Sequence, residues 1–140
     1  MLQVTKVKTG NAFEEHGSYS RLVAVDNLIF VSNTAGRNPS TKLIPEDLTE
    51  QTNQVLDNIA AALKSVDAVL EDVVSARVFV QFPDDVETVM TAYGLRMRGI
   101  NPTLTMTCPP LGSAQYKVEI DVIAYRGASR AEVKELKISL

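Results

Sequence analysis

Hydrophobic residues recur at every second position in some stretches of this chain and at every third or fourth position in others. The first spacing is typical of β-strands and the second of amphipathic helices. No internal repeat or low-complexity linker interrupts the alternation. The order that it predicts is strand, strand, strand, helix, strand, helix, strand, strand. Such a chain should form an α+β fold, with a six-stranded mixed sheet and two helices packed on one face.

Six segments are predicted to be strands because their residues alternate or form short runs of β-branched and aromatic residues. They are residues 2–8, 21–26, 28–32, 73–82, 103–108 and 116–125. Asp26-Asn27 is suited to a tight hairpin turn between the second and third strands. Residues 109–112 turn the chain between the last two strands.

Two segments are predicted to be helices. Asp47, with Glu50 three positions later, has the pattern of a helix capping box. The first helix runs to about residue 66 and its apolar side consists of Leu48, Val55, Ile59, Leu63 and Val66. The second helix begins after Pro83 and ends at Gly99. Its inward positions are Val86, Val89, Met90, Tyr93 and Met97.

The predicted sheet carries hydrophobic residues on both faces. In the last strand, Ile123 and Tyr125 point with Glu119 to the side opposite four other apolar residues, which are Val118, Ile120, Val122 and Ala124. In the strand 73–82, the residues Val74, Val78 and Val80 are expected to lie opposite Val73 and Phe79. Helices can cover only one of these faces, so apolar residues on the other predict a contact between subunits.

Composition narrows the class of protein. A chain of 140 residues with 45% hydrophobic and 22% charged residues has the size of one ordinary domain. We expect that domain to span residues 1–127, followed by a polar tail, residues 128–140, that forms a short helix or a partner-binding arm. The net charge of −3 and the pI near 5.1, without a run of Lys or Arg, disfavour a nucleic-acid partner.

Targeting and metal-binding patterns are absent. The first residues contain no apolar signal segment, and no apolar run is long enough to span a bilayer. A cytoplasmic protein without a membrane partner is therefore expected. One Cys and one His leave no internal disulfide and no zinc site of the usual kinds. Neither a metal nor another cofactor is indicated.

Residues 101–108, Asn-Pro-Thr-Leu-Thr-Met-Thr-Cys, and the strand 116–125 resemble the final two strands of the RidA/YjgF family. Four further segments are similar to that family: residues 17–20, 28–33, 54–59 and 73–80. The resemblance implies a chorismate-mutase-like subunit. It also implies a homotrimer whose sheets face inward and whose three clefts between neighbouring subunits bind a small molecule.

The resemblance also indicates candidate site residues in the first half of the chain. Tyr19 falls where the family has a Tyr beside the cleft, and its hydroxyl could donate to a ligand oxygen or could simply anchor the first loop. Ser32 matches a Ser at a strand end and is a candidate catalytic residue. Asn33 and Thr34 stand where Gly and Gln are usual, so the backbone there is less able to approach a ligand.

Glu119 is the other candidate catalytic residue. It matches the acidic residue with which the family positions water, and a partly buried carboxylate can orient water or accept a proton. A structural ion pair with Arg77 or Lys117 on neighbouring positions is the alternative interpretation.

Leu104 departs from the pattern of the family's imine deaminases. In those enzymes an Arg follows the Pro and a small residue, and its planar guanidinium clamps the substrate carboxylate. Here Leu104 and Met106, both candidate ligand-binding residues, alternate with Thr and make one strand face apolar. Leu cannot hydrogen-bond a carboxylate, and an unpaired anion buried against it would be costly. The usual 2-imino acid substrate is therefore disfavoured.

Arg96 and Arg98 are candidates to replace the missing Arg, because the segment between the second helix and Pro102 is shorter than in the deaminases. The alternative is an ordinary favourable charge at a helix C-terminus. Arg37, in the loop before the first helix, is a weaker candidate of the same kind.

Two further residues have reactive side chains. His16 precedes residues 17–19 and could act as an acid or base, although a solvated loop His is the other interpretation. Cys108 has no feature of an activated thiol and is interpreted as an interface residue rather than a nucleophile.

Three functions from different classes remain. The first is a RidA-like trimer that binds a small organic ligand without typical 2-imino acid deaminase activity. The second is an enzyme on the same scaffold, an enamine or imine deaminase or another hydrolase of divergent specificity. The third is a structural or protein-interaction trimer whose tail docks a partner. Some relatives carry an endoribonuclease label, but the acidic pI gives that activity no support.

Overall fold

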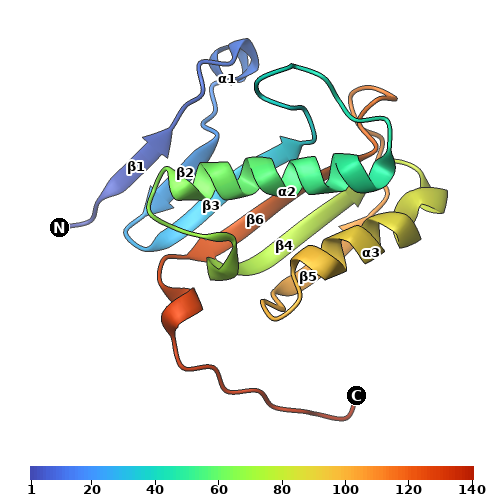
Figure 1. The fold of residues 1–140 in the computed structure, drawn as a ribbon. Helices are drawn as coiled ribbons and strands as arrows, with labels where there is room; N and C mark the ends of the chain where they lie inside the picture. Colours follow the sequence, from blue (N-terminus) through green and yellow to red (C-terminus); the bar gives the residue numbers. More distant parts are fainter.

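The computed structural model describes all 140 residues and contains one mixed β-sheet with helices on one side (Figure 1). The strands follow the order β1-β2-β3-β6-β4-β5 across the sheet. β4 pairs with β5 in parallel, whereas all other neighbours are antiparallel. Their bounds are β1 (Val4–Val7), β2 (Leu22–Val25), β3 (Leu28–Ala35), β4 (Val73–Val80), β5 (Thr103–Thr107) and β6 (Val118–Tyr125).

Three α-helices and three short 3-10 helices complete the fold. Their bounds are α1 (Ala12–Gly17), α2 (Leu48–Lys64), α3 (Val86–Arg96), η1 (Leu70–Asp72), η2 (Pro83–Asp85) and η3 (Ala128–Arg130). α2 begins at the predicted cap, because the backbone N–H of Glu50 donates to the Asp47 carboxylate at 2.9 Å. No helix is long and apolar enough to cross a membrane.

The core lies between the sheet and the two longer helices, α2 and α3, which cover the same face (Figure 1). α2 contributes Val55, Leu56, Ile59 and Leu63, all fully buried, and β6 contributes Val118, Ile120, Val122 and Ala124. Each large side chain in such a position stabilises the fold by about 1.5–3 kcal/mol relative to an exposed one. The predicted six-stranded α+β fold with two helices on one face is confirmed.

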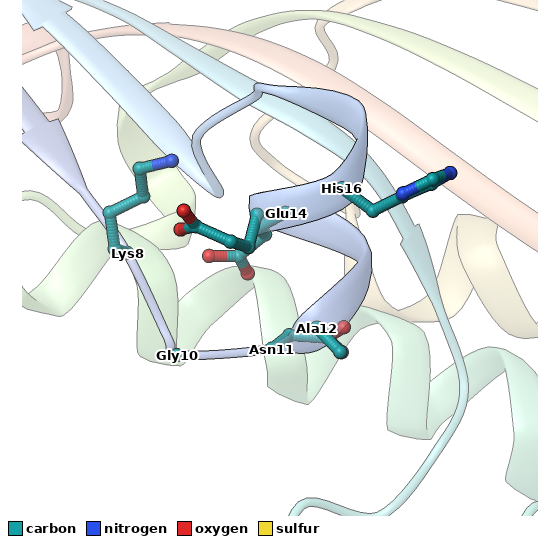
Figure 2. A pocket seen from close by; sticks show the side chains of 7 residues that line it. Lys8, Gly10, Asn11, Ala12, Glu14 and His16 are labelled. Atoms are coloured by element: carbon teal, nitrogen blue, oxygen red, sulfur yellow. The ribbon is translucent and has the colours of Figure 1, made fainter.

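The short helix α1 occupies a segment that was expected to be a loop. It starts where the Asn11 side chain accepts a hydrogen bond from the Phe13 N–H at 2.7 Å, and it ends at Ser18, whose φ of 55° is left-handed. Glu14 is buried on the Lys8 side of this helix and accepts hydrogen bonds from Thr9, while His16 projects to the other side (Figure 2). Six residues are too few to produce a recognisable helical period.

α3 is shorter than predicted. It ends at Arg96, and the chain then turns through Asn101 and Gly99, which both have positive φ. Val89, Tyr93 and Met97 are buried as expected, but Met90 is 46% exposed and does not belong to the inward face. The helix therefore presents a narrower apolar stripe to the core than its composition indicates.

A bulge near the start of β4 changes which residues point inward. The register against β6 shifts between Val73 and Ser75, so Val73 is buried and Val74 is exposed. The prediction that Val74 shares a face with Val78 and Val80 was wrong, because the alternation was counted without the extra residue. From Ala76 onward the strand alternates regularly.

The face of the sheet opposite the helices is open. One part of it is apolar, with Leu28 paired to Tyr125 and Phe30 paired to Ile123 across β3 and β6. Phe30 and Tyr125 are exposed, and Ile123 is half-buried. The predicted two-sided apolar character of β6 is confirmed.

Candidate functional site

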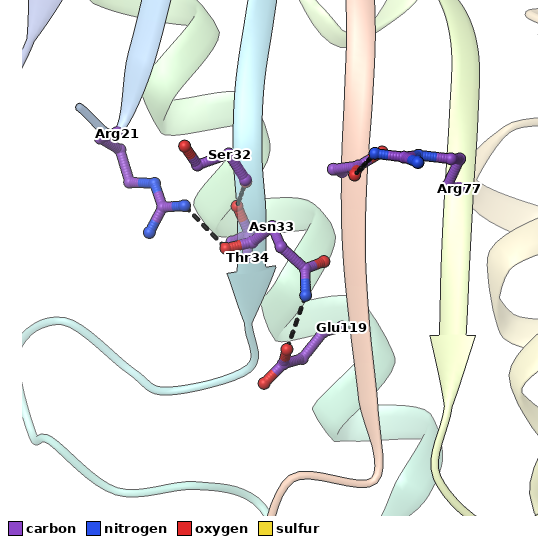
Figure 3. A network of polar contacts seen from close by, with 7 residues as sticks. Arg21, Ser32, Asn33, Thr34, Arg77 and Glu119 are labelled. Carbon is purple, nitrogen blue, oxygen red and sulfur yellow. Dashed lines mark hydrogen bonds and ion pairs between the residues drawn. The ribbon is translucent and has the colours of Figure 1, made fainter. Parts of the chain in front are cut away.

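Glu119 lies on β6 at the margin of the open face, where its register partners are Ala35 on β3 and Phe79 on β4. The Asn33 side-chain amide donates to Glu119 Oε1 at 2.7 Å (Figure 3). Burial raises the pKa of the Glu119 carboxyl above its ordinary value, and the positive charge of Arg21 partly offsets that effect. A carboxyl group of this kind can hold a proton or a water molecule.

Asn33 reaches Glu119 because the β3–β6 register shifts between Val31 and Thr34. Asn33 is exposed on the open side, whereas Thr34 is buried and donates through Oγ1 to the Ser32 carbonyl at 2.7 Å. Asn33 and Thr34, the two residues expected to depart from the family pattern, therefore have different roles in the structure. Asn33 adds an amide beside the carboxylate, and Thr34 is a structural residue.

Arg21 belongs to the cluster around Glu119 and was not among the predicted site residues. Its Nη2 donates to the Asn33 carbonyl at 2.7 Å, and its Nε is buried without a hydrogen-bond partner. A guanidinium has five N–H donors, so several remain for a ligand oxygen. One feature of the sequence could have indicated Arg21. It is the first residue of the predicted strand 21–26, which pairs with the strand that carries Ser32 and Asn33. Figure 3 shows its side chain directed toward that strand.

Ser32 lies on β3, and Tyr19 lies shortly before β2, two residues ahead of Arg21. Ser32 donates its hydroxyl proton to the Ser20 carbonyl at 2.7 Å, which leaves Oγ available as an acceptor. The ring of Tyr19 covers Gly17, where a Cβ would lie 3.0 Å from Tyr19 Cδ1. The backbone carbonyl of Tyr19 accepts from Lys8 Nζ.

Glu119 does not form the ion pair with Arg77 or Lys117 that was the alternative interpretation of this residue. Arg77 instead forms a bidentate contact with Asp121 on β6, at 3.0 Å from Nε and 2.6 Å from Nη2. Lys117 donates through Nζ to the Glu46 carbonyl. Neither cation pairs with Glu119, so the carboxylate keeps one oxygen free of protein hydrogen bonds.

Leu104 and Met106 lie on the edge strand β5, two strands away from β6. Their register partners on β4 are Ala76 and Val78, both buried under the helices, so the two side chains point to the helix-covered face. Leu104 is 40% exposed there. Glu119 points to the other face, and one chain does not bring these two parts of the predicted site together.

Arg96 does not serve as the replacement clamp in this structure. Its Nη1 contacts Asp57 Oδ1 at 2.9 Å and Asn53 Oδ1 at 3.2 Å, both on α2. The guanidinium thus ties α3 to α2. Arg98 is exposed and makes no hydrogen bond or ion pair, and Arg37 donates to the Lys42 carbonyl within its own loop.

The remaining candidates lie outside the Glu119 cluster. His16 lines a separate depression of about 560 Å³ together with Lys8, Gly10, Asn11, Ala12, Glu14 and Glu15 (Figure 2). Cys108 is exposed and follows β5 directly. No group of three or more His, Cys, Asp or Glu side chains is arranged to hold a metal ion.

Known proteins with similar sequences and structures identify the family. The sequence model of the family Endoribonuclease L-PSP matches residues 9–126. A 2-iminobutanoate/2-iminopropanoate deaminase of Rattus norvegicus is 31% identical over 125 residues, which are 86% of this chain and 89% of the relative. A deaminase of the same name from Escherichia coli is 31% identical over 123 residues, covering 86% of this chain and 96% of the relative.

Solved structures agree with the sequence matches. A Mycobacterium tuberculosis member of the YjgF family superposes with a TM-score of 0.78 at 30% identity, covering 88% of this chain and 99% of that one. The YjgF protein of Escherichia coli superposes with a TM-score of 0.77 at 29% identity, covering 87% and 98%. The chain therefore belongs to the RidA/YjgF family and has its chorismate-mutase-like fold.

Proposed function

We propose that this chain binds a small organic ligand in clefts between the subunits of a homotrimer, and that it lacks the 2-imino acid deaminase activity of its relatives. The observation that carries the proposal is the environment of Leu104. The resemblance implies that the deaminases have an Arg at this position. In this chain the position holds Leu104, an apolar side chain on β5. Arg96, one of the two predicted substitutes at the end of α3, is engaged by Asp57 and Asn53.

The division of the candidate residues between two sheet faces supports a site formed by two subunits. Arg21, Asn33 and Glu119 form a polar cluster beside the open face, whereas Leu104 lies on the other side of the same sheet. A neighbouring copy that supplies its β5 edge would join the two halves. Such a cleft would take a ligand with a carbonyl or similar acceptor for Arg21 and Asn33, and an apolar part for Leu104 and Met106.

The direct test is hydrolysis of 2-iminobutanoate, generated in a coupled assay and followed by loss of the imine. The Escherichia coli relative named for this activity provides the positive control. We expect the rate with this protein to stay near that of the uncatalysed reaction. A rate comparable to that of the relative would overturn the proposal, because another group would then be binding the substrate carboxylate.

Glu119 favours a second candidate, a hydrolytic enzyme acting on a different imine or enamine. A half-buried carboxyl with a raised pKa, an amide donor at 2.7 Å and a nearby guanidinium can position and activate water. A set of neutral and anionic imines would be screened for turnover. Loss of turnover in Glu119→Gln, with the assembly intact, would establish this candidate. Equal turnover in Glu119→Gln would exclude Glu119 as its catalytic group.

A further inference from the structure

The C-terminal arm, defined as residues 132–140, follows a segment that hydrogen bonds hold to the domain. Asp72 is buried and accepts hydrogen bonds from the Val69 N–H at 3.1 Å and the Ser129 N–H at 2.8 Å. The bond from Ser129 joins η3 to η1. Arg126 adds a second anchor, because its guanidinium donates to the Val66 carbonyl at 2.8 Å and the Asp26 carbonyl at 2.9 Å. The direction in which the arm departs is therefore set by the fold.

The arm itself has no hydrogen-bond partner within its own chain. Residues 132–140 make no hydrogen bond, and Figure 1 shows them as an extended segment that runs clear of the sheet and the helices. Ile138 is 77% exposed, and Val133 and Leu136 are exposed to a similar extent. Nine residues in extended conformation reach about 30 Å, which is enough to cross to a neighbouring subunit.

The arm has the sequence pattern of a strand. Leu136, Ile138 and Leu140 alternate with Lys137 and Ser139, so an extended backbone would gather the three apolar side chains on one side. An isolated strand leaves its backbone N–H and C=O groups unpaired, and it becomes stable only when added to a sheet edge. The family match ends at residue 126, so the arm is additional to the shared domain.

The sheet has two edges, and they differ in how they are protected. β1 carries Lys6, a charged residue that discourages a further strand. β5 consists of Thr103, Leu104, Thr105, Met106 and Thr107, with no charge, no Pro and no Gly within it. Its outer backbone edge is unpaired. This uncharged edge is the kind that native proteins cover.

The side chains of the β5 edge match those of the arm. Leu104 and Met106 point to one face and the three Thr residues to the other. An added strand with Leu136 and Ile138 on the first face would continue the apolar surface, and Lys137 would lie with the Thr residues. The arm forms no hydrogen bond to the β5 edge of its own chain. The arm of a second copy is therefore the candidate to supply a strand that covers this edge.

We propose that residues 136–140 of one subunit add as a seventh strand to the β5 edge of a neighbouring subunit. The arm would then both fasten the assembly and close the outer side of the strand that carries Leu104. This inference concerns the arm and the edge strand, and it can fail while the trimer and the ligand cleft remain.

Hydrogen exchange of the β5 amides tests the pairing. Removing residues 132–140 deletes no hydrogen bond of the domain, so the shortened chain should still fold. We expect the amides of residues 103–107 that point away from β4 to exchange at least about tenfold faster without the arm, because they lose their hydrogen bonds to it. Amides of the central strand β6 should be unchanged. Equal protection of β5 in both chains would overturn the proposal.

Ile138→Lys and Ser139→Lys form a matched pair of variants within the arm. They add the same charge at adjacent positions, but only the first replaces a residue on the apolar side of the proposed strand. Ile138→Lys should reproduce the faster β5 exchange of the shortened chain, and Ser139→Lys should not. Equal effects of the two substitutions would contradict a strand with the proposed facing.

Cys108 allows the second copy to be identified, because it is the only cysteine and it follows β5 directly. A parallel arm would bring residue 140 near Cys108, and an antiparallel arm would bring residue 136 near it. Under mild oxidation, either Leu136→Cys or Leu140→Cys should form disulfide-linked oligomers, and the link should vanish when Cys108 is replaced by Ser. A link confined to single chains, or no link in either variant, would overturn the assignment to a neighbouring subunit.

Discussion

At the scale of single residues, Glu119 combines three features of a working carboxyl group. It is half-buried, it receives a hydrogen bond from Asn33, and it lies in the field of Arg21. Burial and the arginine act on its pKa in opposite directions, and burial has the larger effect. The balance leaves the pKa of the Glu119 carboxyl above that of an exposed Glu.

Glu119→Gln should change how stability depends on pH. Because the folded-state pKa of Glu119 is raised, its favourable contribution is complete below the ordinary carboxyl pKa and is lost as the pH rises through the folded-state value. Gln does not ionise, so the variant does not lose this stability as the pH rises. It should match the parent in acid and melt at a higher temperature at neutral pH, as measured by thermal unfolding from roughly pH 4 to pH 8. A gap that widened toward acid would contradict the raised pKa.

Arg21→Gln should raise the pKa of Glu119 further, because it removes the cation that favours the carboxylate form. Carbon-13 NMR of the Glu119 carboxyl would follow the titration. Arg77→Gln provides the control, since Arg77 is paired with Asp121 and forms no hydrogen bond or ion pair with Glu119. Equal titration midpoints in the two variants would show that Arg21 does not act on this carboxyl.

Leu104→Arg should be a folded variant without deaminase activity. Leu104 is already 40% exposed at a sheet edge, so a charged side chain there should change the free energy of unfolding by less than about 1 kcal/mol. The substitution adds a cation, but it leaves unchanged Asn33 and Thr34, where the resemblance to the family leads us to expect Gly and Gln. Strong hydrolysis of 2-iminobutanoate by this variant would mean that the site differs from a deaminase by one residue only.

At the scale of secondary-structure elements, Gln51 joins α2 to the strand that carries Glu119. Its side chain is fully buried. Nε2 donates to the carbonyls of Pro45 at 2.8 Å and Gln115 at 3.0 Å, and Oε1 accepts from the Lys117 N–H at 2.8 Å. Gly36 makes the approach possible, since a Cβ there would lie 2.6 Å from the Gln51 carbonyl oxygen.

Gln51→Ala should lower the free energy of unfolding by about 2–4 kcal/mol, because several buried backbone groups lose their only side-chain partner. Urea denaturation would measure the change. Gln54→Ala on the same helix is the control, since Gln54 donates only to Asn58 and is half-buried. We expect about 1 kcal/mol or less for it. Similar costs for both variants would argue against a special role of the Gln51 amide.

Elements with a long regular pattern could be predicted from the sequence, and local irregularities could not. The period of α2 and the alternation of β6 each extend over enough residues to identify the element and its buried side. A single extra residue at Val74 reversed the expected orientation of its neighbours, because strand facing depends on an uninterrupted count. The contacts of Arg21 and Arg96 depend on which elements become neighbours, which no local pattern contains.

At the scale of the whole molecule, the open sheet face is the feature that a single chain does not explain. Leu28, Phe30, Ile123 and Tyr125 form its apolar part, and the Arg77–Asp121 pair lies beside them. A depression of about 510 Å³ is lined by Phe30, Ile123, Arg77 and Asp121, together with Val23 and Ser32. An apolar surface of this kind is uncommon on a protein that remains monomeric, and it supports assembly through this face.

Ile123→Glu should therefore weaken assembly. Light scattering of the parent at micromolar concentration should give three times the mass of the chain, and the variant should dissociate toward a monomer because a carboxylate would have to be buried in the contact. Ala61→Glu is the control, since it adds the same charge at an exposed position of α2 on the opposite side of the sheet. A monomeric parent, or a trimer that Ile123→Glu leaves as stable as Ala61→Glu does, would show that the open face is not the contact surface.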